Sequence, residues 1–107
     1  MVKYKVTVDK SARDNLKSIF NYIKEESSTT AANKVRKGLM DVIYGLAEMP
    51  SRHKIFPKIS NKKYTYRRAL KWSYKIVFVI DEEELVVRVV DIIHASQNLS
   101  TIKSKFQ

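Results

Sequence analysis

The chain has 107 residues, of which 44% are hydrophobic, and its 21 Lys and Arg against 11 Asp and Glu give a formal net charge of +10. This length predicts one domain, and this share of apolar side chains argues against wholesale disorder. No apolar run is long enough for a membrane span or a signal peptide, and the absence of cysteine excludes disulfides and thiolate chemistry. We therefore expect a cytoplasmic protein that contacts no membrane and uses no metal and no cofactor.

The first predicted element is a strand, and an amphipathic helix follows it. Apolar and polar residues alternate over residues 2–8, which is typical of a strand with one buried face. Over residues 11–26 the apolar residues recur at helical spacing, as in a helix that packs with one side. Ser11, with Asp14 following in the same turn, resembles a capping box and predicts where this helix begins.

A second, longer helix is predicted over residues 30–48. The polar run at residues 27–30 offers several N-cap residues. Pro50 sets the far limit of the helix, because the residue before a proline avoids helical backbone. Only a few residues link the two helices, so they must pack as an antiparallel hairpin whose apolar stripes face a sheet.

Four further strands are predicted after the hairpin, over residues 54–58, 64–70, 72–80 and 85–94. The last two are apolar on both faces for much of their length, as the central strands of a covered sheet are. Residues 82–84 are all glutamate and form a solvated turn between these two strands, and residues 95–107 are expected to be a short helix or a tail. The predicted fold class is α+β, in the order β-α-α-β-β-β-β, with a helical hairpin packed on an antiparallel sheet.

The positive charge is concentrated in one third of the chain. Between Glu48 and Asp81 there is no acid, yet aromatic residues alternate with nine basic ones, which are Arg52, Lys54, Lys58, Lys62, Lys63, Arg67, Arg68, Lys71 and Lys75. Cations displace counterions from phosphates and aromatic faces stack on bases, so the pattern suits a nucleic acid. An acidic protein partner or a solvated, lysine-rich strand face would explain the same pattern.

Several short motifs occur in a characteristic order along the chain. They are the apolar stripe from Ala12 to Ile23, Leu46 to Pro50, Tyr66-Arg67-Arg68, Tyr74-Lys75-Ile76-Val77-Phe78, and Asp91-Ile92-Ile93-His94 followed by Gln97-Asn98. In this order and spacing, over residues 2–99, the chain resembles the RelE/ParE superfamily, the toxins of bacterial type II toxin–antitoxin modules. The uninterrupted hairpin and the ending from His94 to Asn98 look closer to the ParE-like branch.

The resemblance implies a function and a partner. ParE-like members inhibit DNA gyrase, and RelE-like members cleave mRNA on the ribosome. We therefore expect a growth-inhibiting toxin of a plasmid-stabilising system, held inactive by a cognate antitoxin in a hetero-oligomer. Gyrase inhibition is the first expectation, and metal-independent cleavage of mRNA by an endoribonuclease is the second. A non-toxic nucleic-acid-binding module with the same basic sheet is the alternative from a different class.

Two residues are candidates for catalysis if the chain is a ribonuclease. Arg68 matches an arginine of RelE-like nucleases and would clamp a phosphate, and His94 lies where some of these enzymes carry a histidine and would transfer a proton. The candidate residues for binding the target or a nucleic acid are Lys54, Lys58, Arg67, Lys71, Trp72, Tyr74 and Lys75. Surface ion pairing, backbone hydrogen bonding, protection of a sheet edge and core packing are the ordinary structural explanations for these residues.

Overall fold

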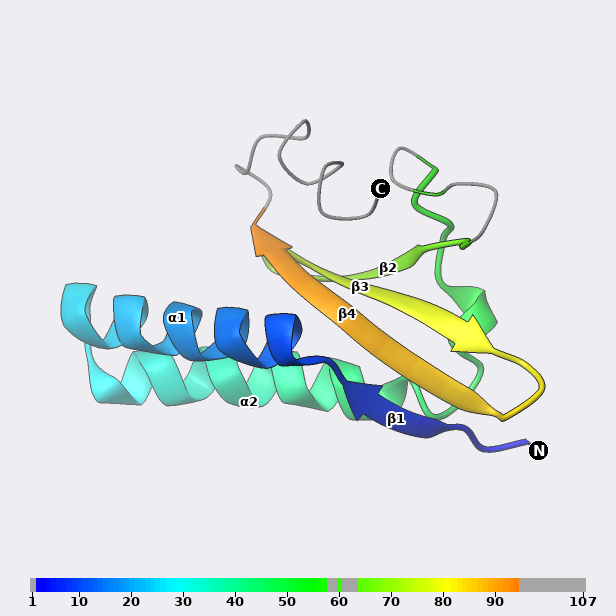
Figure 1. The fold of residues 1–107 in the computed structure, drawn as a ribbon. Helices are drawn as coiled ribbons and strands as arrows, with labels where there is room; N and C mark the ends of the chain where they lie inside the picture. The colour runs from blue at the N-terminus through cyan, green and yellow to red at the C-terminus, as the bar shows by residue number, and fades with distance from the viewer. Residues whose placement is uncertain (1, 58–59, 61–63, 95–107) are drawn as a thin grey trace.

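The computed structural model describes residues 2–57, 60 and 64–94, in which a pair of helices lies along one face of a sheet (Figure 1). The elements are β1 (Lys5–Val8), α1 (Lys10–Glu26), α2 (Thr29–Gly45), the 3-10 turn η1 (Pro50–Arg52), β2 (Arg67–Lys71), β3 (Tyr74–Asp81) and β4 (Val86–His94). The α+β class and the helical hairpin are confirmed. The short helix or tail expected at residues 95–107 lies outside the described residues.

The strand order is β1-β4-β3-β2, and the sheet is mixed. β2, β3 and β4 pair antiparallel as expected, but β1 pairs parallel with β4, with Val6 opposite Val87. The expectation of a wholly antiparallel sheet is therefore wrong at β1. The reason is that the helical hairpin returns the chain to the end of the sheet where β1 begins, so that β2 and β4 run in the direction of β1 (Figure 1).

The strand expected at residues 54–58 is reduced to one bridge, between Ile55 and Arg67. The N–H of Phe56 donates to the carbonyl oxygen of Tyr66 at 2.7 Å, and the N–H of Arg68 donates to that of Lys54 at 3.0 Å. Ser60 occupies the next rung, because its Oγ atom accepts from the N–H of Tyr66 at 2.9 Å and donates to the carbonyl oxygen of Phe56 at 2.9 Å. The described sheet consequently has four strands, whereas the sequence pattern predicted five.

The N-caps of the two helices differ in how well the sequence predicted them. The prediction that Ser11 caps the first helix is wrong, because the N-cap residue of α1 is Asp9. The Asp9 carboxylate forms no capping hydrogen bond and lies 3.4 Å from Nε of Arg88. At α2 the polar run does supply the cap. The Oγ atom of Ser28 accepts a hydrogen bond from the N–H of Ala31 at 3.0 Å.

The end of α2 comes earlier than the predicted residue 48. The helix stops at Gly45, because the chain just after it is recruited to the sheet. The N–H of Tyr4 donates to the carbonyl oxygen of Ala47 at 2.8 Å, and Glu48 forms a bridge with Lys3. Pairing with the start of β1 therefore ends the helix before Pro50 does.

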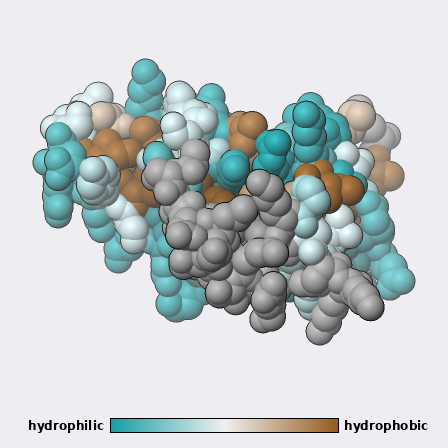
Figure 2. Space-filling model, turned by 90° about the horizontal axis from the view of Figure 1, so that it is seen from above, coloured by the Kyte–Doolittle hydropathy of each residue, from teal (hydrophilic) through white to brown (hydrophobic). Residues whose placement is uncertain are grey.

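The core has two layers, one on each face of the sheet. On the helix side, buried hairpin residues pack on the strands; this layer comprises Ala12, Leu39, Ile43, Leu46, Ala69, Ile76, Phe78, Val87, Val89 and Ile92. On the opposite face, called the far face below, the buried residues are Phe56, Tyr66, Val77, Val90 and Ile93. This confirms that β3 and β4 are central strands covered on both sides. Beyond the sheet the hairpin projects outward, and Figure 2 shows hydrophobic surface exposed there between hydrophilic side chains.

Candidate functional site

The sheet separates the two candidate catalytic residues. Residues opposite each other on neighbouring strands point to the same face. Arg68 is opposite Val77, which belongs to the far-face core, whereas His94 is opposite Tyr74, which packs on the helix-side core. Arg68 and His94 therefore lie on opposite faces, and the structure does not bring them together.

The far face carries a basic and aromatic surface around Arg68. Lys54 is exposed, and its carbonyl oxygen accepts the hydrogen bond from the N–H of Arg68 described above. The ammonium of Lys75 lies 5.2 Å from the ring centroid of Phe56. Burial raises the pKa of Tyr66 in the same layer. Three of the predicted basic residues thus gather here, and the expected Lys58 lies outside the described residues.

Arg67 has a structural role on the other side of β2. Its Nη1 atom donates to the carbonyl oxygen of His53 at 2.7 Å and to that of Ser51 at 3.2 Å. The imidazole of His53 in turn meets the ring of Phe78 edge-on, with 5.8 Å between centroids. Arg67 therefore fastens the η1 turn to the sheet, and its guanidinium is engaged with backbone.

Trp72 and Lys71 lie at the turn between β2 and β3, next to α2. The indole packs against Gly38 of α2 so closely that a Cβ atom there would collide with its Cη2 and Cζ3 atoms. The ammonium of Lys71 lies over the same ring, 4.7 Å from its centroid. Trp72 is nevertheless 53% exposed. Its ring is therefore held against α2 on one side and open to solvent on the other.

His94 lines a cleft of about 390 Å³ where the end of the sheet meets α1. The other lining residues are Ser18, Ile19, Tyr22 and Tyr74. The rings of His94 and Tyr74 meet edge-on, with 5.3 Å between centroids. Burial is the main reason that the pKa of Tyr74 is raised, and Tyr22 adds to the effect. The described lining of this cleft contains no Lys or Arg that would hold a phosphate next to the imidazole.

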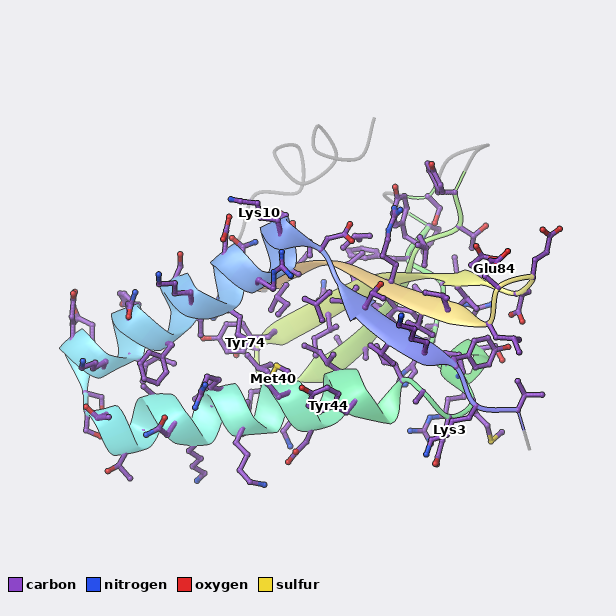
Figure 3. The ribbon with its side chains drawn as sticks, turned by 60° about the horizontal axis from the view of Figure 1, so that its bottom comes forward. Lys3, Lys10, Met40, Tyr44, Tyr74 and Glu84 are labelled. Atoms are coloured by element: carbon purple, nitrogen blue, oxygen red, sulfur yellow. The ribbon has the colours of Figure 1, made fainter. Side chains whose placement is uncertain are left out.

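A groove of about 610 Å³ lies between the two helices, and it is lined by none of the candidate site residues named from the sequence. Its apolar residues are Val8, Leu16, Phe20, Met40 and Tyr44, and its charged ones are Arg13, Lys17 and Arg36. Figure 3 shows Met40 and Tyr44 projecting from α2 toward the space between the helices. The guanidinium of Arg36 lies 5.6 Å from the ring centroid of Phe20. The described lining carries three cations and no acid. In the sequence, the one-turn spacing of Arg13 and Lys17, beside the one-turn spacing of Leu16 and Phe20, is the signal that could have located these lining residues.

Asp91 belongs to one of the sequence motifs, but the sequence alone gave it no role. It is the one charged residue that is buried in the described part of the chain, at 1% exposure. The register of β4 against β3 shifts between Val77 and Phe78, and this bulge lies beside Asp91. The Nδ2 atom of Asn15 donates to the Asp91 carboxylate and to the carbonyl oxygen of Ile92, so this pair attaches α1 to β4.

Within residues 2–57, 60 and 64–94, no group of three or more His, Cys, Asp or Glu side chains is arranged to hold a metal ion. In the same residues, no helix has the length and apolar character needed to cross a bilayer.

Comparison with known proteins gives one family and a set of similar folds. The family model described as the ParE toxin of the type II toxin–antitoxin system parDE matches residues 6–99. No curated protein sequence matches the chain.

Solved structures with the same fold come from toxin–antitoxin systems. The chromosomal ParDE system of P. aeruginosa gives a TM-score of 0.72 at 12% identity, covering 90% of this chain and 100% of the other. The RelBE2 complex of Mycobacterium tuberculosis gives 0.65 at 18% identity, covering 87% and 99%. The archaeal RelE–RelB complex of Pyrococcus horikoshii gives 0.63 at 12% identity, covering 92% and 100%. At these identities the similarity establishes the fold.

Proposed function

We propose that this chain, which belongs to the ParE toxin family of type II toxin–antitoxin systems, inhibits DNA gyrase in the cytoplasm. A cognate antitoxin neutralises it in this proposal. One observation favours gyrase over mRNA as the target. Arg68 and His94, the residues that RNA cleavage would need together, lie on opposite faces of the sheet.

The chemistry of RNA cleavage explains why this separation matters. Without a metal, the reaction needs a base for the 2′-hydroxyl, an acid for the leaving oxygen and a cation at the crowded phosphate, all within hydrogen-bond reach of one another. The cleft around His94 offers an imidazole and two phenols but no described cation. Arg68 and Lys75 offer the cations, but on the far face. An inhibitor that acts by binding needs no such assembly.

Induction of the toxin without its antitoxin tests this proposal. We expect DNA supercoiling to be lost while bulk mRNA stays intact, and purified toxin to inhibit supercoiling by purified gyrase. His94→Ala, shown to be folded by its melting curve, should remain as toxic as the wild type. Cleavage of mRNA on translating ribosomes that falls about 10²-fold or more in His94→Ala would instead identify the chain as a ribonuclease.

The second candidate function is mRNA cleavage on the far face, and the cluster of Lys54, Arg68 and Lys75 there is the observation in its favour. If this function is correct, Arg68→Ala should lower cleavage about 10²-fold or more, because a guanidinium stabilises the phosphate charge in the transition state. Lys24→Ala, which removes the same charge at an exposed position near the end of α1, is the matched control and should leave cleavage unchanged.

The groove between α1 and α2 is the proposed antitoxin site. An amphipathic helix binds such a groove with apolar side chains at successive turns, and acids beside them would meet Arg13, Lys17 and Arg36. The similar solved structures named above are toxin–antitoxin complexes, which supports an antitoxin as the occupant.

A charge reversal in the groove tests the antitoxin site. Arg36→Glu should weaken antitoxin binding by about tenfold or more, because it puts an acid where the antitoxin is expected to carry one. Lys34→Glu makes the same change in net charge on α2 but outside the groove, and it should have a much smaller effect. Equal losses in the two variants would contradict the groove as the binding site, and would leave only the overall positive charge as the attraction.

A further inference from the structure

The backbone of Trp72 is in the left-handed conformation, which is unfavourable for a bulky side chain. Among the described residues, the non-glycine residues with left-handed backbone are Met49, Trp72 and Leu85, with φ of 47°, 51° and 55°. This conformation is sterically unfavourable for a residue with a Cβ atom. In the two-residue link between β2 and β3, Gly or Asn would occupy the position of Trp72 without that cost. An outlier of this kind at an exposed position calls for a functional explanation.

A second observation singles out Trp72 from the other two residues. Its ring fits against α2 only because residue 38 is a glycine, and a glycine inside a helix is destabilising relative to alanine. Two locally unfavourable residues, one in a turn and one in a helix, therefore hold the indole in one place. Lys71 lies over the ring and limits its motion further. The result is a rigid aromatic side chain that is still 53% exposed.

We propose that the exposed part of Trp72 contacts the protein target of the toxin, at a surface distinct from the antitoxin groove; this rests on the proposed function. At 3.6 residues per turn, Met40 and Tyr44 lie about 200° and 240° around α2 from Gly38, so the groove and Trp72 are on different sides of that helix. Trp is the residue type most typical of interface hot spots, where a ring enters a pocket of the partner.

The surroundings of Trp72 indicate the chemistry of the partner. Lys71 covers the ring, and Lys34 lies one turn before Gly38 on the same side of α2. A pocket bordered by acids would complement both cations. A nucleobase stacks over a whole aromatic face, whereas here a helix covers the benzene edge and an ammonium lies over the ring. These contacts favour a protein partner over a nucleic acid.

The test uses Trp72→Gly with Leu85→Gly as its matched control, because Leu85 is the other exposed, bulky residue with left-handed backbone at the start of a strand. Glycine suits the backbone at both positions. We expect Trp72→Gly to lower toxicity in cells about tenfold or more and to keep its affinity for the antitoxin. Leu85→Gly should be as toxic as the wild type.

Gly38→Ala is the second variant, and it tests whether Trp72 contacts the target if Trp72→Gly does not fold. It leaves the indole in the chain but forces it from its position, so toxicity should fall here too. Folded Trp72→Gly or Gly38→Ala with wild-type toxicity would overturn the proposal. A loss of single-stranded oligonucleotide binding by Trp72→Gly, measured by fluorescence anisotropy, would replace the protein partner by a nucleic acid. If wild-type toxin spares gyrase but Trp72→Gly still loses toxicity, the gyrase assignment fails while the contact residue stands.

Discussion

Asp91 and Asn15 show what one buried polar pair does for this fold. A buried carboxylate is stable only where donors replace the lost water, and Asn15 brings such a donor from α1. Because the carboxylate also accepts from the N–H of Ile92 at 2.9 Å, it stabilises the bulged part of β4 and the position of α1 together. A helix that is held in this way keeps the groove between α1 and α2 and the His94 cleft in place.

Replacement of Asn15 by alanine should therefore destabilise the protein. We expect the free energy of unfolding, measured by urea denaturation, to fall by about 1–3 kcal/mol, since a buried acceptor loses a donor. Asn21→Ala has the same effect on helix propensity at an exposed position of α1, and it should change stability by about 0.5 kcal/mol or less. Similar values for the two variants would mean that the buried pair contributes little.

His53 should make stability depend on pH. Burial lowers the pKa of its imidazole, and Arg52 and Arg67 lower it further. The neutral form of the imidazole is therefore favoured more in the folded protein than in the unfolded chain. The unfolded chain therefore binds the proton first as pH falls below about 6.5. The contribution of His53 is complete above that pH and is lost as pH falls toward the lower folded pKa.

Urea midpoints measured at a series of pH values check this expectation. The wild type should lose stability between about pH 7 and pH 5, and His53→Gln should lose less over the same range. His94 is present in both proteins and cancels in the comparison. Parallel pH profiles for the two proteins would show that His53 titrates alike in the folded and unfolded states.

At the scale of elements, the helical hairpin depends on its N-cap at α2. The Oγ atom of Ser28 satisfies a backbone N–H that has no partner inside the helix. Ser28→Ala should lower the free energy of unfolding by about 1 kcal/mol, as N-cap removal commonly does. Thr30→Ala, two residues into the same helix, is the control for the loss of a hydroxyl and should be neutral or slightly stabilising. A thermal melt of both variants tests the difference.

The strands show why element boundaries are harder to predict than element types. The strand predicted at residues 54–58 is reduced to a single bridge, because the side chain of Ser60 takes the backbone groups of Phe56 and Tyr66 that would form the next rung. The end of α2 was likewise set by a segment distant in sequence, the start of β1. Local patterns predict which conformation a segment prefers, and the neighbours it meets in the fold decide how far that conformation extends.

At the scale of the whole molecule, the net charge of +10 should govern how fast the antitoxin binds. Opposite charges steer two proteins toward each other before contact, and salt screens this attraction over about 10 Å at 0.1 M. We expect the association rate constant, measured by stopped flow, to fall about tenfold or more between low and high salt, with a smaller change in the dissociation rate. An association rate that is independent of ionic strength would contradict electrostatic steering.

The sequence by itself determined the parts of this protein that local physics controls. The period of the apolar residues predicted the helical hairpin, the continuous apolar runs predicted that β3 and β4 are central, and the order of the motifs pointed to the toxin family. Side-chain periodicity and apolar runs follow from which surfaces a segment must bury, so they can be read without knowing what covers them.

Only the tertiary structure decided which of the candidate residues come together. Arg68 and His94 both lie at plausible positions in the sequence, yet strand register places them on opposite faces of the sheet. The fit of Trp72 on Gly38 likewise joins residues far apart in the chain. A shift of register by one residue moves a side chain to the other face, and that register depends on long-range pairing and on the bulge in β4, which no local pattern encodes.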